Sequence, residues 1–342
     1  MFRPLEGVQV LDLSRVLAGP YTAKLLSDLG ATVLRVEAPW GDDTRGWGPP
    51  FTEIEDEQVA AYWTSVNLGK SIIRKNLKIK SDLQDVRKLI SDSDIIIENF
   101  RPGKAEEWFE PWPDKAIVCS ISAYGNEGPR SREGGYDIVM QARSGLMSIT
   151  GDENGTTAKV GVAVIDVATG LHASSAIIAA LYRREKEGIG AKLTLSLWDC
   201  ALDLLVNQAQ NAIISGKNPA PMGTSHPNLV PYRAFQAKDG WFVIGVGSDD
   251  QWEKLCGYLS IDFKEAWAEN AGRISDRAQI ESLISDIVSK YSRALLEELL
   301  KGIPCAPVNT VTEALNDKQS KERKLITQYN GVDVLASPLR FY

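Results

Sequence analysis

The sequence predicts an α/β fold: a large domain built on a parallel sheet, and a smaller α+β region. Three observations support this prediction. Short apolar strands alternate with helical segments over the first two thirds of the 342 residues, as in parallel sheets. A hairpin and a run of helices then follow. Two segments rich in proline, residues 217–235 and 302–315, stand beside these regions and are typical of linkers.

The N-terminal part carries the signals of the parallel sheet. We expect strands over residues 8–14, 32–39 and 115–125, a helix over residues 19–30, and a helix followed by a strand over residues 82–100. Pro20 suits the first turn of the first helix, and Gly30 suits its end. The strand over residues 8–14, the helix over residues 19–30 and the strand over residues 32–39 form a β-α-β unit of about thirty residues, which begins a parallel sheet.

A helix rich in small residues follows Asp166 and ends at Gly188. Basic residues crowd its last turn, as the helix dipole favours. Beyond it we expect a strand and one long helix over residues 191–216, and then a hairpin over residues 234–247. Three helical segments and an extended C-terminal end complete the chain.

These elements divide the chain into four parts. Residues 1–216 form the large domain, residues 217–233 a linker, residues 234–301 the small α+β domain, and residues 302–342 a return linker with the C-terminal part of the large domain.

Composition excludes several classes of protein. The net charge of −7 argues against a general nucleic-acid binder. No apolar run approaches a membrane span, so we expect no membrane partner. The N-terminus lacks a signal-peptide pattern, and the four cysteines are widely spaced, which predicts reduced thiols in a cytoplasmic protein. Two histidines and scattered cysteines predict no metal site.

Three loops follow strands and contain both glycine and proline, at residues 14–20, 98–103 and 122–129. Because ligands bind at the carboxyl ends of parallel strands, such loops can hold phosphates or a pantetheine-like arm. Each loop taken alone is more often an ordinary turn. A dinucleotide-dependent oxidoreductase is disfavoured because the first loop has only Gly19 and no Gly-x-Gly-x-x-Gly. A non-catalytic anion-binding module stays open.

Asp166 stands where an apolar run meets the first turn of its helix. The pattern alone favours an N-cap, since aspartate is among the best capping residues. The alternative is a reactive carboxylate beside the positive end of a helix.

The chain resembles the class III CoA-transferases, also called the CaiB/BaiF family, over nearly its whole length. Nine segments carry the resemblance, in order: LDLSRVLAGP, LLSDLGATVLRVEAPWGDDTRGW, VNLGKSI, ENFRPG, SAYGNEGP, GGYDIVMQARSGLMSITG, VGVAVIDVATGLHASSAIIAALYRRE, HPNLVPYRAF and GIPCAPV. The resemblance implies a Rossmann-like large domain, a small domain reached through two linkers, and a homodimer of interlocked, ring-like subunits.

The resemblance also assigns residues. It implies that Asp166 is the nucleophile and that CoA esters are the substrates, with no prosthetic group. By position it implies CoA contacts for the following residues: Val16, Leu17, Ala18, Lys78, Asn99, Phe100, Arg101, Tyr136 and Asp137. We expect the first turn of the Asp166 helix to supply oxyanion donors.

The runner-up is a 2-methylacyl-CoA racemase of the same fold. Racemases resemble this chain but carry a His-Asp pair where it has Tyr136 and Asp137. A racemase needs two acid/base groups, and tyrosine is a poor base at neutral pH. We expect His172 to be a core or groove histidine within the packed helix, so the transferase is favoured.

The chain departs from the family at three points, of which the first two concern the binding of the CoA phosphates and the third concerns contacts between subunits. Ala38 and Glu107 stand where some members have basic residues, and Arg15, Arg35, Arg45 or Lys70 are the candidates to compensate. Relatives also continue past the SPLRFY segment into a Leu-Gly-x-His-Thr signature.

The segments SGLMSITGDENG and HPNLVPYRAF look most like the branch that transfers CoA from succinyl-CoA to glutarate or other dicarboxylates. Arg143 and Arg233 are candidates, on charge alone, to bind the second carboxylate of such an acceptor.

Overall fold

The computed structural model describes residues 3–341. The chain divides into two compact units. The first unit contains the described residues of 1–147, 159–219 and 319–342, and the second contains residues 148–158 and 220–318.

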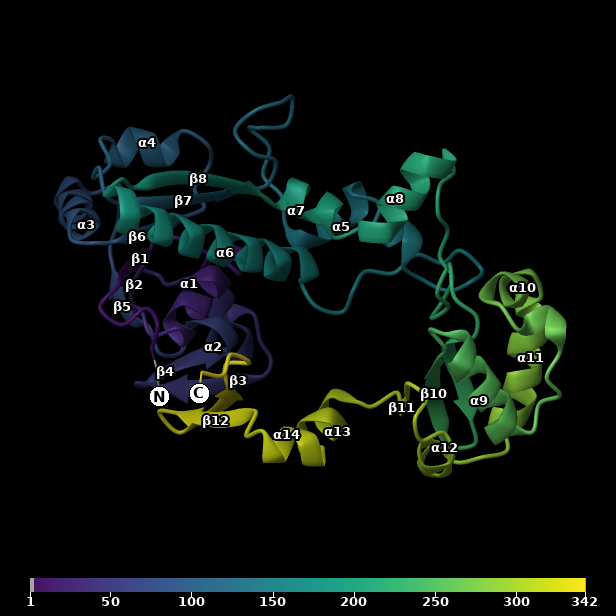
Figure 1. The fold of residues 1–342 in the computed structure, drawn as a ribbon. Helices are drawn as coiled ribbons and strands as arrows, with labels where there is room; N and C mark the ends of the chain where they lie inside the picture. Colours follow the sequence, from purple (N-terminus) through teal and green to yellow (C-terminus); the bar gives the residue numbers. More distant parts are fainter. Residues whose placement is uncertain (1–2, 342) are drawn as a thin grey trace. The chain divides into compact units, whose positions relative to one another are not determined.

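A six-stranded sheet forms the centre of the first unit (Figure 1). Its strands are β1 (Gln9–Asp12), β2 (Thr32–Glu37), β5 (Ser71–Arg74), β6 (Ile95–Glu98), β7 (Ile117–Ser122) and β8 (Ala191–Ser196). The order is β5-β2-β1-β6-β7-β8, and every neighbouring pair is parallel. The predicted α/β class with a parallel sheet is confirmed. The chain order reverses between β1 and β6, and in open α/β sheets ligands bind beside this switch point.

Helices cover both faces of this sheet because its strands are buried on both sides. Side chains that point to one face of the sheet, such as those of Ile97 and Cys119, pack in the same core as Ala173 and Ile177 of helix α6 (Val164–Glu187). Side chains that point to the other face, such as that of Ile96, pack against the helices on the opposite side. The covering helices are α1 (Ala18–Asp28) and α6 on one face, and α3 (Lys80–Ser91) and α4 (Lys104–Phe109) on the other.

Shorter elements complete the first unit. They are η1 (Asp43–Gly46), β3 (Phe51–Ile54), β4 (Glu57–Ala60), α2 (Ala61–Asn67), α5 (Asp137–Arg143), α7 (Leu197–Asp203), α8 (Val206–Ser215), β12 (Ile326–Tyr329) and β13 (Val332–Leu335). Of the strand and single long helix predicted over residues 191–216, the strand is confirmed as β8, but the single helix is wrong: it is divided into α7 and α8, because the backbone breaks at Val206, where φ is 40°. Two further elements, η2 (Met147–Ile149) and α14 (Lys318–Glu322), lie where the chain passes between the units.

Helix α6 is long and apolar enough to cross a membrane by length and composition alone. Half of its most apolar window is buried inside the protein. Ala173 and Ile177 are fully buried in the core beneath the sheet, and the core helix of a globular domain meets the same criterion.

The second unit is an α+β structure. Its antiparallel sheet has the order β11-β10-β9. Its elements are β9 (Tyr232–Ala237), β10 (Gly240–Gly245), α9 (Asp249–Leu259), η3 (Glu265–Trp267), α10 (Asn270–Ser275), α11 (Arg277–Val288), α12 (Arg293–Leu299), β11 (Cys305–Pro307) and α13 (Val311–Asn316). Trp252 and Trp267 fill its core at a ring distance of 6.2 Å.

The two compact units differ in extent from the four parts expected from the sequence. Residues 148–158 lie in the second unit rather than with the large domain. The N–H of Gly223 donates to the carbonyl of Gly151 at 3.0 Å, and Arg233 pairs with Glu153 at 3.1 Å. These contacts join two segments that are far apart in the chain, and sequence pattern alone carries no sign of them. The functional division into domains and linkers stays a prediction.

Candidate active site

Asp166 lies in the first turn of α6, as predicted, but it is not the N-cap. The helix begins at Val164, and Ala163 occupies the cap position without a side-chain hydrogen bond. Asp166 is the third helical residue and is 8% exposed. The capping role that the pattern favours is therefore wrong.

The cap comes from another helix. Asp137, at the start of α5, accepts the N–H of Ile165 at 2.8 Å and that of Asp166 at 3.4 Å through Oδ1. Its Oδ2 accepts a hydrogen bond from the amide of Gln141. Asp137 thus uses both oxygens within the chain, and it fixes the turn that carries Asp166.

The oxyanion donors expected in this turn are already bonded. Ile165 and Asp166 donate to Asp137, Val164 donates to the carbonyl of Val162, and Val167 donates to that of Ala163. The expectation that these N–H groups supply an oxyanion hole is therefore wrong for this conformation.

The environment of Asp166 makes its carboxylate difficult to ionise. Burial raises the pKa of Asp166 to about 7, and the charge of Asp137 adds to the rise. Within residues 3–341, no cation is paired with this carboxylate in the structure. A buried carboxyl with a strongly shifted pKa is a candidate functional group.

Two aromatic residues that sequence reasoning missed lie beside this site. Tyr62 of α2 is half-buried, and burial raises its pKa to about 12, helped by the charges of Asp166 and Asp137. Trp47 packs edge-on against Tyr62 at 5.3 Å and against Tyr136 at 6.5 Å between ring centroids. Tyr136 itself is 59% exposed. Aromatic residues in a loop carry no periodic signal, so no sequence pattern pointed to Trp47.

The predicted CoA loop lies at the switch point of the sheet. In the loop between β1 and α1, Val16 is half-buried and Leu17, the N-cap of α1, is buried, as is Ala18, the first residue of that helix. Asn99, just after β6, bonds the backbone of Arg15 twice: its Oδ1 accepts the N–H and its Nδ2 donates to the carbonyl, both at 2.8 Å. The first and second predicted loops are therefore joined directly.

Asp166 is brought close to this loop by one tight packing contact. At Gly170, one helical turn after Asp166, an added Cβ would lie 2.8 Å from the ring of Tyr21 and 3.1 Å from the carbonyl of Ala18. Only a glycine allows α6 to approach the start of α1 this closely without a shift.

The other predicted contacts lie along the same edge of the sheet. Phe100 packs edge-on against Trp108 at 5.3 Å, and its N–H donates to Glu98 at 2.8 Å. Arg101 is exposed, as is Lys78 in the loop before α3. Burial raises the pKa of Glu98 to about 7.

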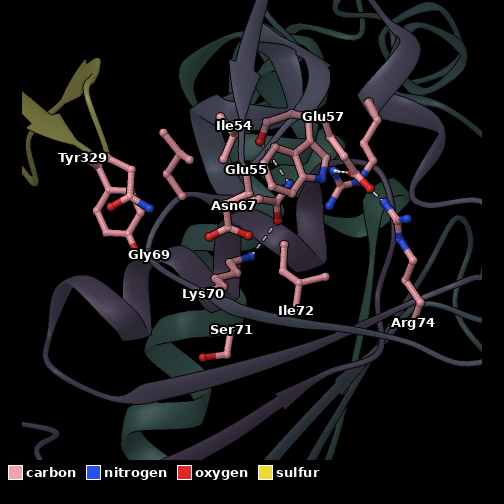
Figure 2. Close-up of a pocket in the computed structure, with 14 residues that line it drawn as sticks. Ile54, Glu55, Glu57, Asn67, Gly69, Lys70, Ser71, Ile72, Arg74 and Tyr329 are labelled. Atoms are coloured by element: carbon pink, nitrogen blue, oxygen red, sulfur yellow. Dashed lines mark hydrogen bonds and ion pairs between the residues drawn. The ribbon is translucent and has the colours of Figure 1, made fainter.

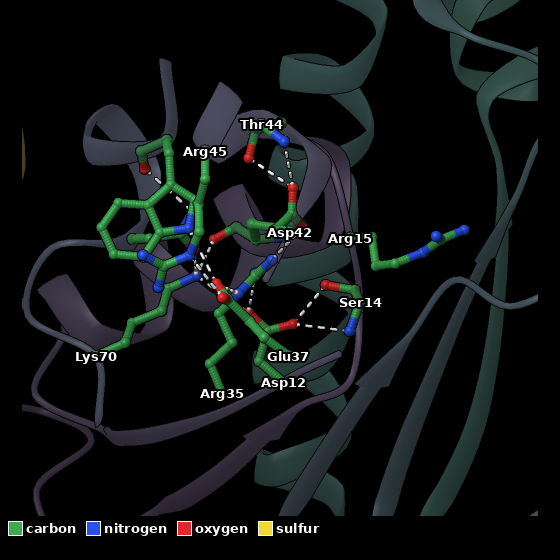
Figure 3. Close-up of polar contacts among 12 residues, drawn as sticks. Asp12, Ser14, Arg15, Arg35, Glu37, Asp42, Thr44, Arg45 and Lys70 are labelled. Carbon is green, nitrogen blue, oxygen red and sulfur yellow. Dashed lines mark hydrogen bonds and ion pairs between the residues drawn. The ribbon is translucent and has the colours of Figure 1, made fainter. Parts of the chain in front are cut away.

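Three of the four cations expected to compensate for Ala38 and Glu107 are already paired with carboxylates and so are not free to bind phosphates. Arg35 and Lys70 have fully buried side chains and are paired with Asp12 (Figure 3). Arg45 pairs with Glu37 at 2.7 Å and Glu57 at 3.0 Å. Arg15 is exposed and extends away from these ion pairs, as Figure 3 shows.

The two candidate cations for an acceptor carboxylate differ in whether they are paired with an acid within the described part of the chain. Arg233 is held in the second unit by Glu281 at 2.8 Å and Glu153 at 3.1 Å. Arg143 is exposed at the end of α5, with its guanidinium 6.0 Å from the ring of Tyr124.

The structure corrects the expected environment of His172. Its side chain is 49% exposed on α6 and contacts the carboxylate of Asp203 at 3.2 Å. Of the two predicted environments, the core is therefore wrong, and the side chain lies partly exposed on the surface of α6.

A pocket of about 420 Å³ lies elsewhere in the first unit, against the edge strand β5 (Figure 2). It is lined by residues of the β3–β4 hairpin, α2 and β5, and by Tyr329 of the C-terminal hairpin. None of the predicted CoA contacts lines this pocket. Phe100 and Arg101 line a much smaller pocket with Glu98 instead. We place the candidate site at the switch point because the buried carboxyl of Asp166, whose pKa is raised, lies near the loops that follow β1 and β6.

Comparison with known proteins identifies the family. The model of CoA-transferase family III matches residues 5–341. The chain is 38% identical to a succinate–glutarate CoA-transferase of Agrobacterium fabrum, over 98% of this chain and 87% of that protein. It is 37% identical to the human succinyl-CoA:glutarate CoA-transferase, over 95% of this chain and 76% of that one.

A solved structure agrees with these matches. A CaiB/BaiF family protein from Brucella suis superposes with a TM-score of 0.89 at 39% identity, covering all of this chain and 93% of that one. The chain therefore belongs to CoA-transferase family III, and it is a CoA-transferase.

Proposed function

We propose that this enzyme transfers CoA from succinyl-CoA to glutarate or a similar dicarboxylate, with Asp166 as the nucleophile. The observation that carries the mechanism is the buried Asp166 carboxyl, which has no paired cation among the described residues and lies one helical turn from the packing contact with the switch-point loop. The substrates are suggested by the relatives, whose names specify succinyl-CoA and glutarate.

In the first half-reaction, an ionised oxygen of Asp166 attacks the carbonyl carbon of the thioester. The C–S bond breaks, CoA leaves as a thiolate, and an aspartyl–succinyl anhydride remains. The thiolate then attacks the aspartyl carbonyl, which releases succinate and leaves CoA in thioester linkage to Asp166. Binding holds the reacting groups together, so neither attack requires a diffusional encounter.

The second half-reaction reverses these steps with the acceptor. A carboxylate of glutarate attacks the aspartyl thioester and expels the CoA thiolate, which gives an aspartyl–glutaryl anhydride. The thiolate then attacks the glutaryl carbonyl. Glutaryl-CoA forms, and the carboxylate of Asp166 is regenerated.

The surroundings of Asp166 support this chemistry. Partial desolvation makes a carboxylate less stable as an anion, and so it strengthens an otherwise weak nucleophile. Tyr62 keeps its proton at neutral pH, since its pKa is about 12, and its hydroxyl can donate to a developing oxyanion. Exposed Arg15 and Lys78 are the proposed cations for the CoA phosphates, and Arg143 is the proposed partner of the distal acceptor carboxylate.

The proposed assembly is a homodimer in the cytoplasm. Helix α8 exposes Val206, Ile213 and Ile214 at 71%, 74% and 77%, and exposed apolar residues of this kind mark interaction surfaces. The four cysteines are free thiols, as in a reducing compartment. Light scattering of the purified protein tests the dimer: a monomeric mass contradicts it.

The function is tested by incubating the enzyme with succinyl-CoA and a panel of free acids, followed by mass analysis of the CoA esters. We expect glutaryl-CoA when glutarate is supplied. Hydroxylamine added during turnover converts an acylated aspartate into a hydroxamate, and peptide mass analysis should locate it at Asp166.

The matched variants are Asp166→Ala and Asp203→Ala, the second an acid that is exposed. We expect the first to lose turnover and the second to keep it. Turnover by Asp166→Ala at the wild-type rate overturns the mechanism. Exchange of the α-hydrogen in deuterated water without CoA transfer would instead favour a racemase.

A further inference from the structure

The loop between β1 and α1 contains a strained residue. Val16 has a φ of 68°, in the left-handed region that β-branched side chains rarely occupy. Such a conformation is strained and persists only where the surrounding structure holds it. The strain lies within the loop that the proposed function assigns to CoA.

Three side chains from three segments hold this loop. Asp12 accepts the N–H and the hydroxyl of Ser14, and Asn99 makes its two bonds to the backbone of Arg15. Asp42 accepts the N–H of Val16 at 3.2 Å through Oδ2. Each of three consecutive residues is therefore held by a different polar side chain, and Asp42 bonds the strained one.

Asp42 is itself fixed on its far side. Its Oδ2 also accepts a hydrogen bond from Nη2 of Arg35 at 2.5 Å. Its Oδ1 accepts hydrogen bonds from the N–H of Thr44 at 2.9 Å and from the hydroxyl of Thr44 at 2.6 Å. Arg35 extends to Asp12 as well, at 3.0 Å, so one buried guanidinium joins two of the side chains that hold the loop (Figure 3).

The position of Asp42 excludes direct binding of a ligand in this conformation. Asp42 is 5% exposed, and its two oxygens already accept four hydrogen bonds. Asp42 can therefore act on a bound molecule only indirectly: through the backbone of Val16, which it bonds, or through its charge, which also contributes to the raised pKa of Tyr62.

We propose that Asp42 is a positioning residue for acyl-CoA: its carboxylate keeps Val16 in the left-handed conformation and so holds the loop in its binding shape before the ligand arrives. Preorganisation of this kind increases affinity because the cost of ordering is met during folding. This inference rests on the proposed function, since the loop matters for binding only if CoA lies against it.

Glu37 offers a matched control. It is 3% exposed and accepts hydrogen bonds from Arg35, Arg45 and Trp63, at 3.2, 2.7 and 3.0 Å. It belongs to the same ion-pair network as Asp42, but its side-chain bonds go to these three residues and not to residues 14–18.

The experiment compares Asp42→Ala with Glu37→Ala by calorimetric titration with CoA, thermal melting, and steady-state kinetics. We expect both variants to melt at lower temperature. Asp42→Ala should raise the Kd for CoA and the KM for acyl-CoA about tenfold or more, with kcat changed less than about threefold. Glu37→Ala should keep both binding constants within about twofold of the wild type.

If either alanine variant fails to fold, the isosteric pair Asp42→Asn and Glu37→Gln replaces it. The amide introduced by Asp42→Asn can accept on one side only, so it cannot hold Thr44 and Val16 together. An unchanged Kd in the folded Asp42 variants overturns the inference, and so does an equal loss of affinity in the Glu37 variants. If the wild type fails to bind CoA at all, the proposed function fails with it.

Discussion

Two groups of buried carboxylates lie in the first unit, and they differ in whether a cation neutralises their charge. Asp12, Glu37 and Asp42 surround Arg35, with Lys70 beside Asp12. Asp137 and Asp166 lie together without a paired cation among the described residues.

The difference appears in their pKa values. Burial raises the pKa of Asp12, but Lys70 and Arg35 outweigh burial and hold it below its usual value. At Asp166 nothing opposes burial, and its pKa rises to about 7. The paired carboxylates are held ionised by neighbouring cations, whereas the ionised form of Asp166 is destabilised by burial and by the charge of Asp137, as we expect of the proposed nucleophile. A reactive site of this kind commonly lowers the stability of the fold.

The largest expected effect is on the paired group. Arg35→Met leaves three buried carboxylates without their shared partner, and breaking a buried pair costs about 3–5 kcal/mol. Urea unfolding measures the loss. The control is Arg101→Met, at an exposed position, where we expect a change within about 0.5 kcal/mol. Equal unfolding midpoints for the two variants would show that the paired network contributes nothing to stability.

The second prediction concerns Asp166→Asn and stability. The pKa of Asp166 is higher in the folded protein than its usual 3.8, so folding favours the protonated form. This contribution is complete below pH 3.8 and is lost as the pH rises through about 7. An asparagine at this position does not ionise, so the variant does not lose this contribution to the free energy of unfolding as the pH rises. We expect the variant to be more stable than the wild type at pH 8, on the order of 2–4 kcal/mol, and equally stable near pH 4.

Denaturant unfolding at both pH values checks this prediction. A wild type that is at least as stable as Asp166→Asn at pH 8 would mean that the carboxylate has a stabilising partner.

The third prediction concerns the rate. Only ionised Asp166 can attack a thioester, so the rate of the donor half-reaction should rise with pH through about 7. Between pH 6 and pH 8 we expect about a tenfold increase in kcat/KM for the acyl-CoA. A pH-independent rate over this range would contradict the raised pKa.

The smallest expected effect is that of the Asp137 charge on the pKa of Asp166. Asp137→Asn removes the charge that adds to the rise at Asp166, while its remaining oxygen can still accept the N–H of Ile165. We expect the midpoint of the pH–rate profile to move down by less than about one unit, because burial is the larger cause. An upward movement would show that Asp137 does not act through its charge.

Local pattern predicted much of the fold, and the family resemblance supplied the candidate nucleophile. Alternating strands and helices predicted the parallel sheet, and the position of Asp166 at the start of a small-residue helix marked it for attention. Pattern failed where partners came from distant segments. Asp137 caps α6 from 28 residues before Ile165, and Arg35 lies fully inside the protein although arginine is usually exposed.

Periodicity and motif order are local properties of the chain, so the order of most elements, the family resemblance and the place of Asp166 at the start of a helix could be predicted from the residues alone. Which carboxylates have a cation beside them could be learned only from the folded chain. That outcome depends on contacts across the sheet, and it makes Arg35 and Asp42 a support for the loop and leaves Asp166 with a pKa near neutrality.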